Sequence, residues 1–138
     1  MSPSVVRDGL RAAVPAAILS GLPSTLHALL TRRDPLEASI AASSILLPNE
    51  SRRGRLLAAA APVHLGLSLF WSLTLAALLP RRKPIAEGIA AGVVIAAIDL
   101  GVIGRRYRLI EALEPVPQLA DHIAFGIVTA HLLYKFDE

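Results

Sequence analysis

Five of the ionisable side chains that interrupt the apolar segments of this chain are of the types that bind metals or move protons, and we expect them to lie close to one face of the membrane. They are His27, His64, Asp99, Asp121 and His122. Placing an ionisable group inside a membrane span costs free energy, so we expect each of these groups to have a structural or functional role. If the segments are helices that alternate in direction, these groups lie at a similar depth near one end, with His64 about one turn deeper. The sequence therefore predicts an intramembrane polar layer.

Four kinds of chemistry fit this layer. His27, His64, Asp99 and His122 have the donor atoms of a divalent metal site. His27 and His122 also suit a haem held between two helices. Because histidine titrates near neutral pH, proton-coupled transport with Asp99 is a third reading. The fourth is recognition of a lipid phosphate, with arginine holding the headgroup and His or Asp acting as acid or base.

A structural role for the same layer is the alternative, in which these side chains hydrogen-bond one another, the backbone or headgroups and hold the bundle together. The chain has no compact H-x-x-x-H or H-E-x-x-H spacing, which weakens the metal reading. We therefore expect no catalytic residue and no cofactor, and a divalent metal and haem remain open alternatives.

Long apolar segments must position these side chains. The segment 56–79 carries no formal charge, and as a helix it would rise ~36 Å, which is enough to cross a ~30 Å hydrocarbon core. Four spans fit the sequence, at 12–30, 56–79, 85–103 and 119–134. In the first span, Pro15 and Pro23 predict kinks, because proline removes a helical hydrogen bond.

The segment 35–47 lies between the first two spans and is too short to cross a membrane. Asp34-Pro35-Leu36-Glu37 is typical of a helix start, with Asp34 as N-cap and Glu37 reaching back. A helix over 35–47 would be ~20 Å long, so it is either interfacial or re-entrant. The predicted fold is all-α, a polytopic membrane bundle of four transmembrane helices plus this short helix, in a single membrane domain over 1–138.

Composition supports this class. The chain has 138 residues, of which 54% are hydrophobic and only 4% aromatic, so its apolar content is mainly Ala, Leu, Ile and Val. It has no cysteine, which excludes disulfides and thiolate chemistry. Gly88 and Gly92 form a G-x-x-x-G pattern, which predicts close helix packing or a small homo-oligomer.

Arginine clusters occupy the loops. Side A is the end that holds the N-terminus, the 80–84 loop and the end of the fourth span, and side B holds the 31–55 and 104–118 loops. Basic residues on side A are Arg7, Arg11, Arg81, Arg82, Lys83 and Lys135, and those on side B are Arg32, Arg33, Arg52, Arg53, Arg55, Arg105, Arg106 and Arg108. This near-balance gives no orientation. Beside membrane spans, such clusters favour anionic lipids over nucleic acid as partners, and we expect headgroup contacts at Arg52, Arg53, Arg55, Arg105, Arg106 and Arg108.

The segment Asp121-His122-Ile-Ala-Phe125-Gly126-Ile-Val-Thr129-Ala, with His27 in a first span rich in small residues, resembles the H-x-x-(Y/F)-G-x-x-T ending of some small uncharacterised bacterial inner-membrane proteins. The match covers roughly the last twenty residues, and the rest of the chain matches in hydropathy only. The resemblance implies a four-span protein of the bacterial cytoplasmic membrane and supplies no activity.

From these observations we expect a small multi-pass membrane protein that is not an enzyme. The first hypothesis is an accessory, scaffold or assembly subunit of a larger membrane complex, or a homo-oligomer. The alternative is a small proton-coupled transporter, or a lipid- or metal-handling protein, that uses the polar layer.

Overall fold

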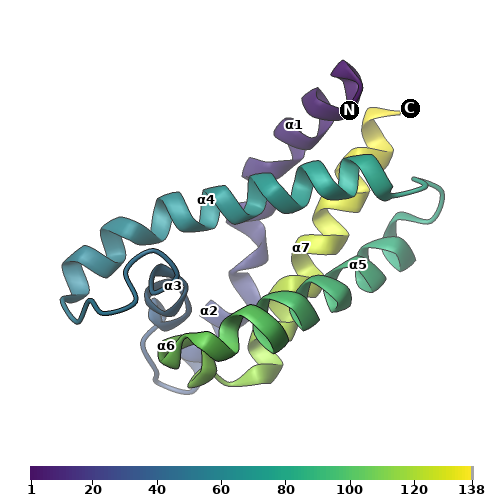
Figure 1. Cartoon of the computed structure of the whole chain (residues 1–138). Helices are drawn as coiled ribbons and strands as arrows, with labels where there is room; N and C mark the ends of the chain where they lie inside the picture. Colours follow the sequence, from purple (N-terminus) through teal and green to yellow (C-terminus); the bar gives the residue numbers. More distant parts are fainter. Residues whose placement is uncertain (138) are drawn as a thin grey trace.

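The computed structural model describes residues 1–137, and those residues form helices joined by short loops, with no strand among them. Both described ends of the chain lie at one end of the molecule, and the short helices α3 and α6 lie at the other (Figure 1). In chain order the elements are α1 (Pro3–Ser20), α2 (Leu22–Leu30), α3 (Glu37–Ser43), α4 (Arg53–Leu78), α5 (Pro84–Ile98), a π-helical turn (Asp99–Ile103), a 3-10 turn (Gly104–Arg106), α6 (Arg108–Glu111) and α7 (Pro115–Phe136).

The first predicted span is two helices. It begins at Pro3 rather than near residue 12, because the Ser2 side chain accepts a hydrogen bond from the Val5 N–H and caps α1. Pro15 lies inside α1, whereas Pro23 falls in the first turn of α2, where a missing N–H costs nothing. In place of a kink at Pro23, the helix is interrupted at Gly21, between α1 and α2.

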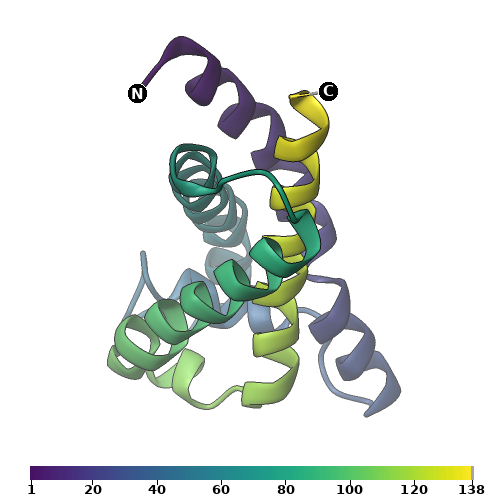
Figure 2. The ribbon, with the colours of Figure 1, turned by 90° about the vertical axis from the view of Figure 1, so that its right-hand side faces the viewer.

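The core is built from small residues. Gly9, Ala12, Ala13 and Ala16 form the buried face of α1, which packs on α4 and α7. A Cβ on Gly9 would lie 2.9 Å from Leu73 Cδ2, so α1 and α4 approach closely. Figure 2 shows α4 nearly end-on, with α5 crossing α7 beside it.

Three glycines bring the backbones of α5 and α7 into contact. A Cβ on Gly88 would lie 2.5 Å from Ile127 Cα, one on Gly92 would lie 2.5 Å from Ile123 Cα, and one on Gly126 would lie 2.1 Å from the Gly88 carbonyl oxygen. The G-x-x-x-G face is thus occupied within the chain. Gly88 and Gly92 are buried against α7 and are not exposed for the homo-oligomer contact that the pattern also suggested.

The short helix predicted over 35–47 is shorter in the structure. Asp34 Oδ1 accepts from the Leu36 N–H at 3.0 Å, which makes a turn, and α3 begins only at Glu37. Glu37 does not reach back to the helix start, because its carboxylate pairs with Arg33 Nε at 3.1 Å. Helix α3 packs on α4 and α6 and is half-buried. This packing is compatible with an interfacial and with a re-entrant helix.

Arg81 ties the side A end together. Its guanidinium contacts Asp8 of α1 at 3.3 Å, Asp137 at 2.8 Å and the Ala76 carbonyl of α4 at 3.0 Å. Its backbone is left-handed, with φ 58°. The Glu87 carboxylate accepts hydrogen bonds from the backbone N–H groups of residues 81–83, each at 3.0 Å. Its main partners are therefore backbone groups.

Three helical stretches of the described chain are long and apolar enough to cross a membrane: Pro3–Leu30, Arg53–Leu78 and Pro84–Arg106. The predicted count of four is therefore not confirmed. Helix α7 has 22 residues, carries Gln118, Asp121, His122 and Lys135, and is not among these three stretches.

Candidate functional site

A polar link joins three helical segments at the middle of the molecule. Trp71 Nε1 of α4 donates to Asp99 Oδ2 at 2.9 Å, and His122 Nε2 of α7 lies 3.5 Å from the same oxygen. Asp99 begins the π-helical turn that follows α5. Because α4 packs mainly on α1 and α3, and α5 packs mainly on α7, this link bridges two parts of the bundle.

The positions of the hydrogens in this link follow from the groups that the two ring nitrogens of His122 contact. His122 Nδ1 lies 2.7 Å from the Gln118 carbonyl oxygen, which can only accept, so Nδ1 carries a hydrogen. His122 Nε2 faces a carboxylate oxygen that already accepts from Trp71. A contact between Nε2 and Asp99 is favourable only when one proton is held between them, on either the ring or the carboxylate. The geometry of this contact therefore requires one proton between the two side chains.

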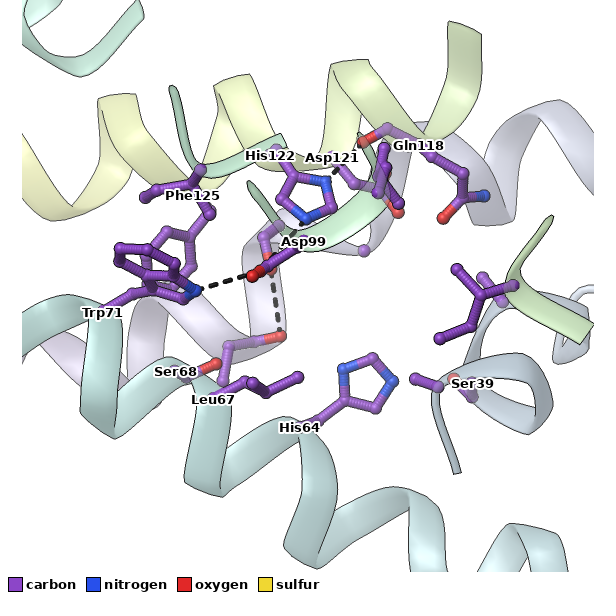
Figure 3. A pocket seen from close by; sticks show the side chains of 18 of the residues that line it. Ser39, His64, Leu67, Ser68, Trp71, Asp99, Gln118, Asp121, His122 and Phe125 are labelled. Carbon is purple, nitrogen blue, oxygen red and sulfur yellow. Dashed lines mark hydrogen bonds and ion pairs between the residues drawn. The ribbon is translucent and has the colours of Figure 1, made fainter. Parts of the chain in front are cut away.

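A cavity of about 510 Å³ lies against this link. Its walls come from α1 to α7, and most of the lining is apolar or small: Ala17, Ile18, Ala38, Ala42, Leu67, Ile95, Ile103, Ile110, Leu113 and Phe125 are examples. Figure 3 shows Trp71, Asp99 and His122 on one wall of the cavity, with His64 and Ser39 across from them. The site therefore combines an apolar volume with one polar wall.

Asp121 accepts a hydrogen bond from the backbone at the start of α2, just after the break between α1 and α2. Its Oδ1 accepts from the Ser24 N–H at 2.8 Å, and Ser24 lies in the first turn of α2. The first N–H groups of a helix have no partner within the helix, and they favour negative charge. The carboxylate on α7 thus caps α2 beside the cavity, and a bond across 97 positions of sequence fixes α2 to α7.

His64 lines the cavity without a hydrogen-bond partner among the described residues, and the side chain is exposed to the open volume. Of the five residues of the predicted layer, the structure brings His64, Asp99, Asp121 and His122 around one cavity. Three of these four have fixed partners, which leaves His64 as the group that is free to meet a ligand.

His27 does not belong to this group. Its Nε2 lies 2.7 Å from Glu114 Oε2 at the side B end, and Arg33 binds the other oxygen of Glu114. The hydrogen bond from His27, with the charge of Arg33, holds the pKa of Glu114 below its ordinary value. The predicted placement of His27 in the layer is corrected because α2 ends at Leu30 and its last turn lies beside the start of α7.

The predicted metal set is not assembled. Within residues 1–137, no three His, Cys, Asp or Glu side chains are grouped as a metal ion would require. The reason is that His27 is engaged by Glu114, while His122 points Nδ1 at a backbone carbonyl. His27 also does not line the cavity with His122, so the structure does not place the two histidines as a pair of haem ligands.

The predicted headgroup arginines divide into two sets. Arg53 pairs with Asp34, while Arg52 and Arg55 each lie 3.3 Å from a Glu50 oxygen. Arg105, Arg106 and Arg108 are exposed and have no carboxylate partner among residues 1–137. The structure thus separates arginines that hold the side B loops together from arginines that face outward.

Three contributors were missed in the sequence: Trp71 as the donor to Asp99, the Gln118 carbonyl that orients His122, and the Ser24 N–H. The i,i+4 spacing of Gln118 and His122 was the only local signal for any of them. For Trp71 there was no such signal, because no pattern predicts which carboxylate an indole N–H will reach.

In comparisons with known proteins, no family model, no curated protein and no solved structure matches the chain. Function is therefore inferred from the cavity and its polar wall.

Proposed function

We propose that this chain is an integral membrane protein with four spans that binds an amphipathic membrane molecule in the cavity between α4, α5 and α7. The observation that carries the proposal is the cavity of about 510 Å³ with the Trp71–Asp99–His122 link on its wall. Ligand sites typically enclose ~300–1,000 Å³, mostly apolar, with a few placed polar groups. An acyl or prenyl chain fits the apolar lining, and a hydroxyl, amide or amine fits the polar wall.

Helix α7 is proposed as the fourth span. Its 22 residues would rise ~33 Å, which matches a bilayer core. It packs on α1, α2 and α5, and Gln118, Asp121 and His122 line the cavity. Polar side chains that face a cavity are tolerated in a span. The resemblance stated above favours the bacterial cytoplasmic membrane as the location.

Filling the cavity tests the proposal. Ala42 of α3 lines the cavity wall, and Ala42→Phe would add a ring to the volume. Purification in mild detergent, followed by native mass spectrometry and lipid extraction, identifies the molecule that co-purifies. We expect one wild-type ligand per chain and at least about a tenfold lower occupancy in Ala42→Phe, which corresponds to a clash above about 1.4 kcal/mol.

Ala58→Phe is the matched control, because Ala58 is exposed on α4 and does not line the cavity. Equal occupancy in wild type and control with loss in Ala42→Phe supports the site. A wild-type protein without a bound molecule, or equal loss in both variants, contradicts the proposal. Elemental analysis of the same sample tests the metal reading.

A non-enzymatic accessory subunit is the second candidate. The observation that favours it is that Asp99 and Asp121 are bonded within the chain, as polar groups that hold helices together would be. A large partner that co-purifies in stoichiometric amount, and that Asp99→Asn still binds, would support this candidate over ligand binding.

A further inference from the structure

The outward-facing arginines on side B follow directly after the third apolar stretch. Arg105 and Arg106 form the 3-10 turn, and Arg108 begins α6. The helix before them presents exposed Val94, Ile98 and Val102 along its length. A sequence that passes from exposed aliphatic side chains to arginine is typical of the boundary between hydrocarbon and headgroups.

The backbone holds the three arginines on one compact turn. The Gly104 N–H donates to the Asp99 carbonyl and closes the π-helical turn. A Cβ on Gly104 would lie 2.7 Å from Ile110 Cγ2, so α6 folds back tightly against this glycine. The arginines therefore lie on a fixed corner of the fold rather than on a long loop.

Charge on this corner is not neutralised within the chain. Arg33, Arg52, Arg53 and Arg55 each pair with a carboxylate on side B. Among residues 1–137, Arg105, Arg106 and Arg108 have no such partner. Arg32 also lacks one, but it lies in a separate loop beyond α2. Exposed Ile103 and Leu109 flank the corner and are 36% and 41% exposed, so the surface has both a cationic and an apolar part.

We propose that Arg105, Arg106 and Arg108 form a binding site for the phosphate of anionic phospholipids in the leaflet at side B. A guanidinium binds a phosphate through two parallel hydrogen bonds, which gives it an advantage over a point charge. Ile103 and Leu109 would contact the upper part of the acyl chains. The cavity shares Ile103 with this surface, but Arg105, Arg106 and Arg108 do not line it. A test on the three arginines is therefore independent of the proposed function.

The test compares two triple variants with equal charge loss. In R105Q/R106Q/R108Q the unpaired arginines are removed, and in R52Q/R53Q/R55Q the paired ones are removed. Each protein is reconstituted in nanodiscs of phosphatidylcholine with phosphatidylglycerol, and native mass spectrometry counts the phosphatidylglycerol retained. Each basic residue near an anionic surface strengthens binding by about fivefold, so we expect a loss on the order of 100-fold in the first variant and little in the second.

Two further arms separate the alternatives. R105K/R106K/R108K keeps the charge but not the paired hydrogen bonds, and we expect intermediate retention. Inorganic phosphate at millimolar concentration should not displace the lipid; displacement would assign the site to free phosphate and overturn the proposal. Equal losses in the two triple variants would overturn it too, by showing a general charge effect. If the first triple variant does not accumulate, the three single Gln variants serve in its place, with about fivefold expected for each.

Discussion

At the scale of single residues, Asp99 concentrates the contacts on which the cavity wall depends. Trp71→Phe removes the donor to Asp99 Oδ2, and Asp99→Asn removes the charge that faces His122. A polar group left without its partner in an apolar wall costs about 1–3 kcal/mol. We expect each variant to lower the free energy of unfolding in detergent by that amount, measured by loss of helical circular dichroism.

The double variant tests whether the two residues act together. Because both changes weaken contacts of the same Asp99 carboxylate, W71F/D99N should cost less than the sum of the single variants by about 0.5–3 kcal/mol. Strict additivity would mean that the indole and the carboxylate are not bonded in the membrane.

Glu50 predicts a dependence on acidity at side B. Its carboxylate accepts from the Arg52 backbone N–H at 2.9 Å and also meets the side chains of Arg52 and Arg55, and these contacts lower its pKa to about 2. A carboxylate with a lowered pKa stabilises the fold above its ordinary pKa of 4.5. The stabilisation is then lost as the pH falls from 4.5 toward about 2.

We therefore expect the unfolding temperature of the wild type to fall more steeply in this window than that of Glu50→Gln. Glu111→Gln is the control, because Glu111 is exposed and its side chain makes no hydrogen bond or ion pair in the described chain. Parallel pH profiles for the wild type and Glu50→Gln would refute this role of Glu50.

At the scale of elements, the α5–α7 contact is the tightest in the molecule. A Cβ at Gly126 would meet the Gly88 carbonyl oxygen at 2.1 Å, and both atoms belong to helix backbones that cannot move alone. Gly126→Ala should therefore push the two helices apart and destabilise the protein by about 1–3 kcal/mol, the range for overpacking. The measurement is thermal unfolding in detergent.

Gly66→Ala provides the contrast within the same protein. Gly66 lies in α4, and a Cβ there meets nothing within 4 Å. Alanine has a higher helix propensity than glycine by up to about 1 kcal/mol, so this variant should be neutral or slightly stabilising. If both substitutions have the same effect, the close approach of α5 and α7 is not what limits stability.

Much of the element order could be predicted from apolar length alone, because 56–79 and 85–103 nearly coincide with α4 and with the stretch from α5 to the π-helical turn. The π-helical turn at Asp99 could not, since no local pattern in Asp-Leu-Gly-Val-Ile distinguishes it from an ordinary helical sequence. Four of the five residues predicted to form the polar layer, His64, Asp99, Asp121 and His122, line one cavity. His27 lies outside it beside Glu114, which is 87 positions away, and no periodicity relates the two.

At the scale of the whole molecule, the four spans that we propose would place Ser4 and Asp137 on one side of the membrane and Ser51 on the other. The chain has no native cysteine, so single cysteines at these positions report sidedness without background. We expect Ser4→Cys and Asp137→Cys to react with an impermeant maleimide from the same side, and Ser51→Cys from the opposite side. Labelling of Ser4 and Asp137 from opposite sides would show three spans and exclude α7.

Helix α7 is also the last of these helices to leave the ribosome, and this sets an order for biogenesis. It contacts α1, α2, α4 and α5, caps the broken first span through Asp121, and brings His122 to Asp99. If α7 is the fourth span, as proposed, the nascent chain carries, until α7 enters the bilayer, a glycine groove without its partner helix and a carboxylate with the indole as its main donor. The earlier helices can be inserted one by one, but their final positions wait for α7.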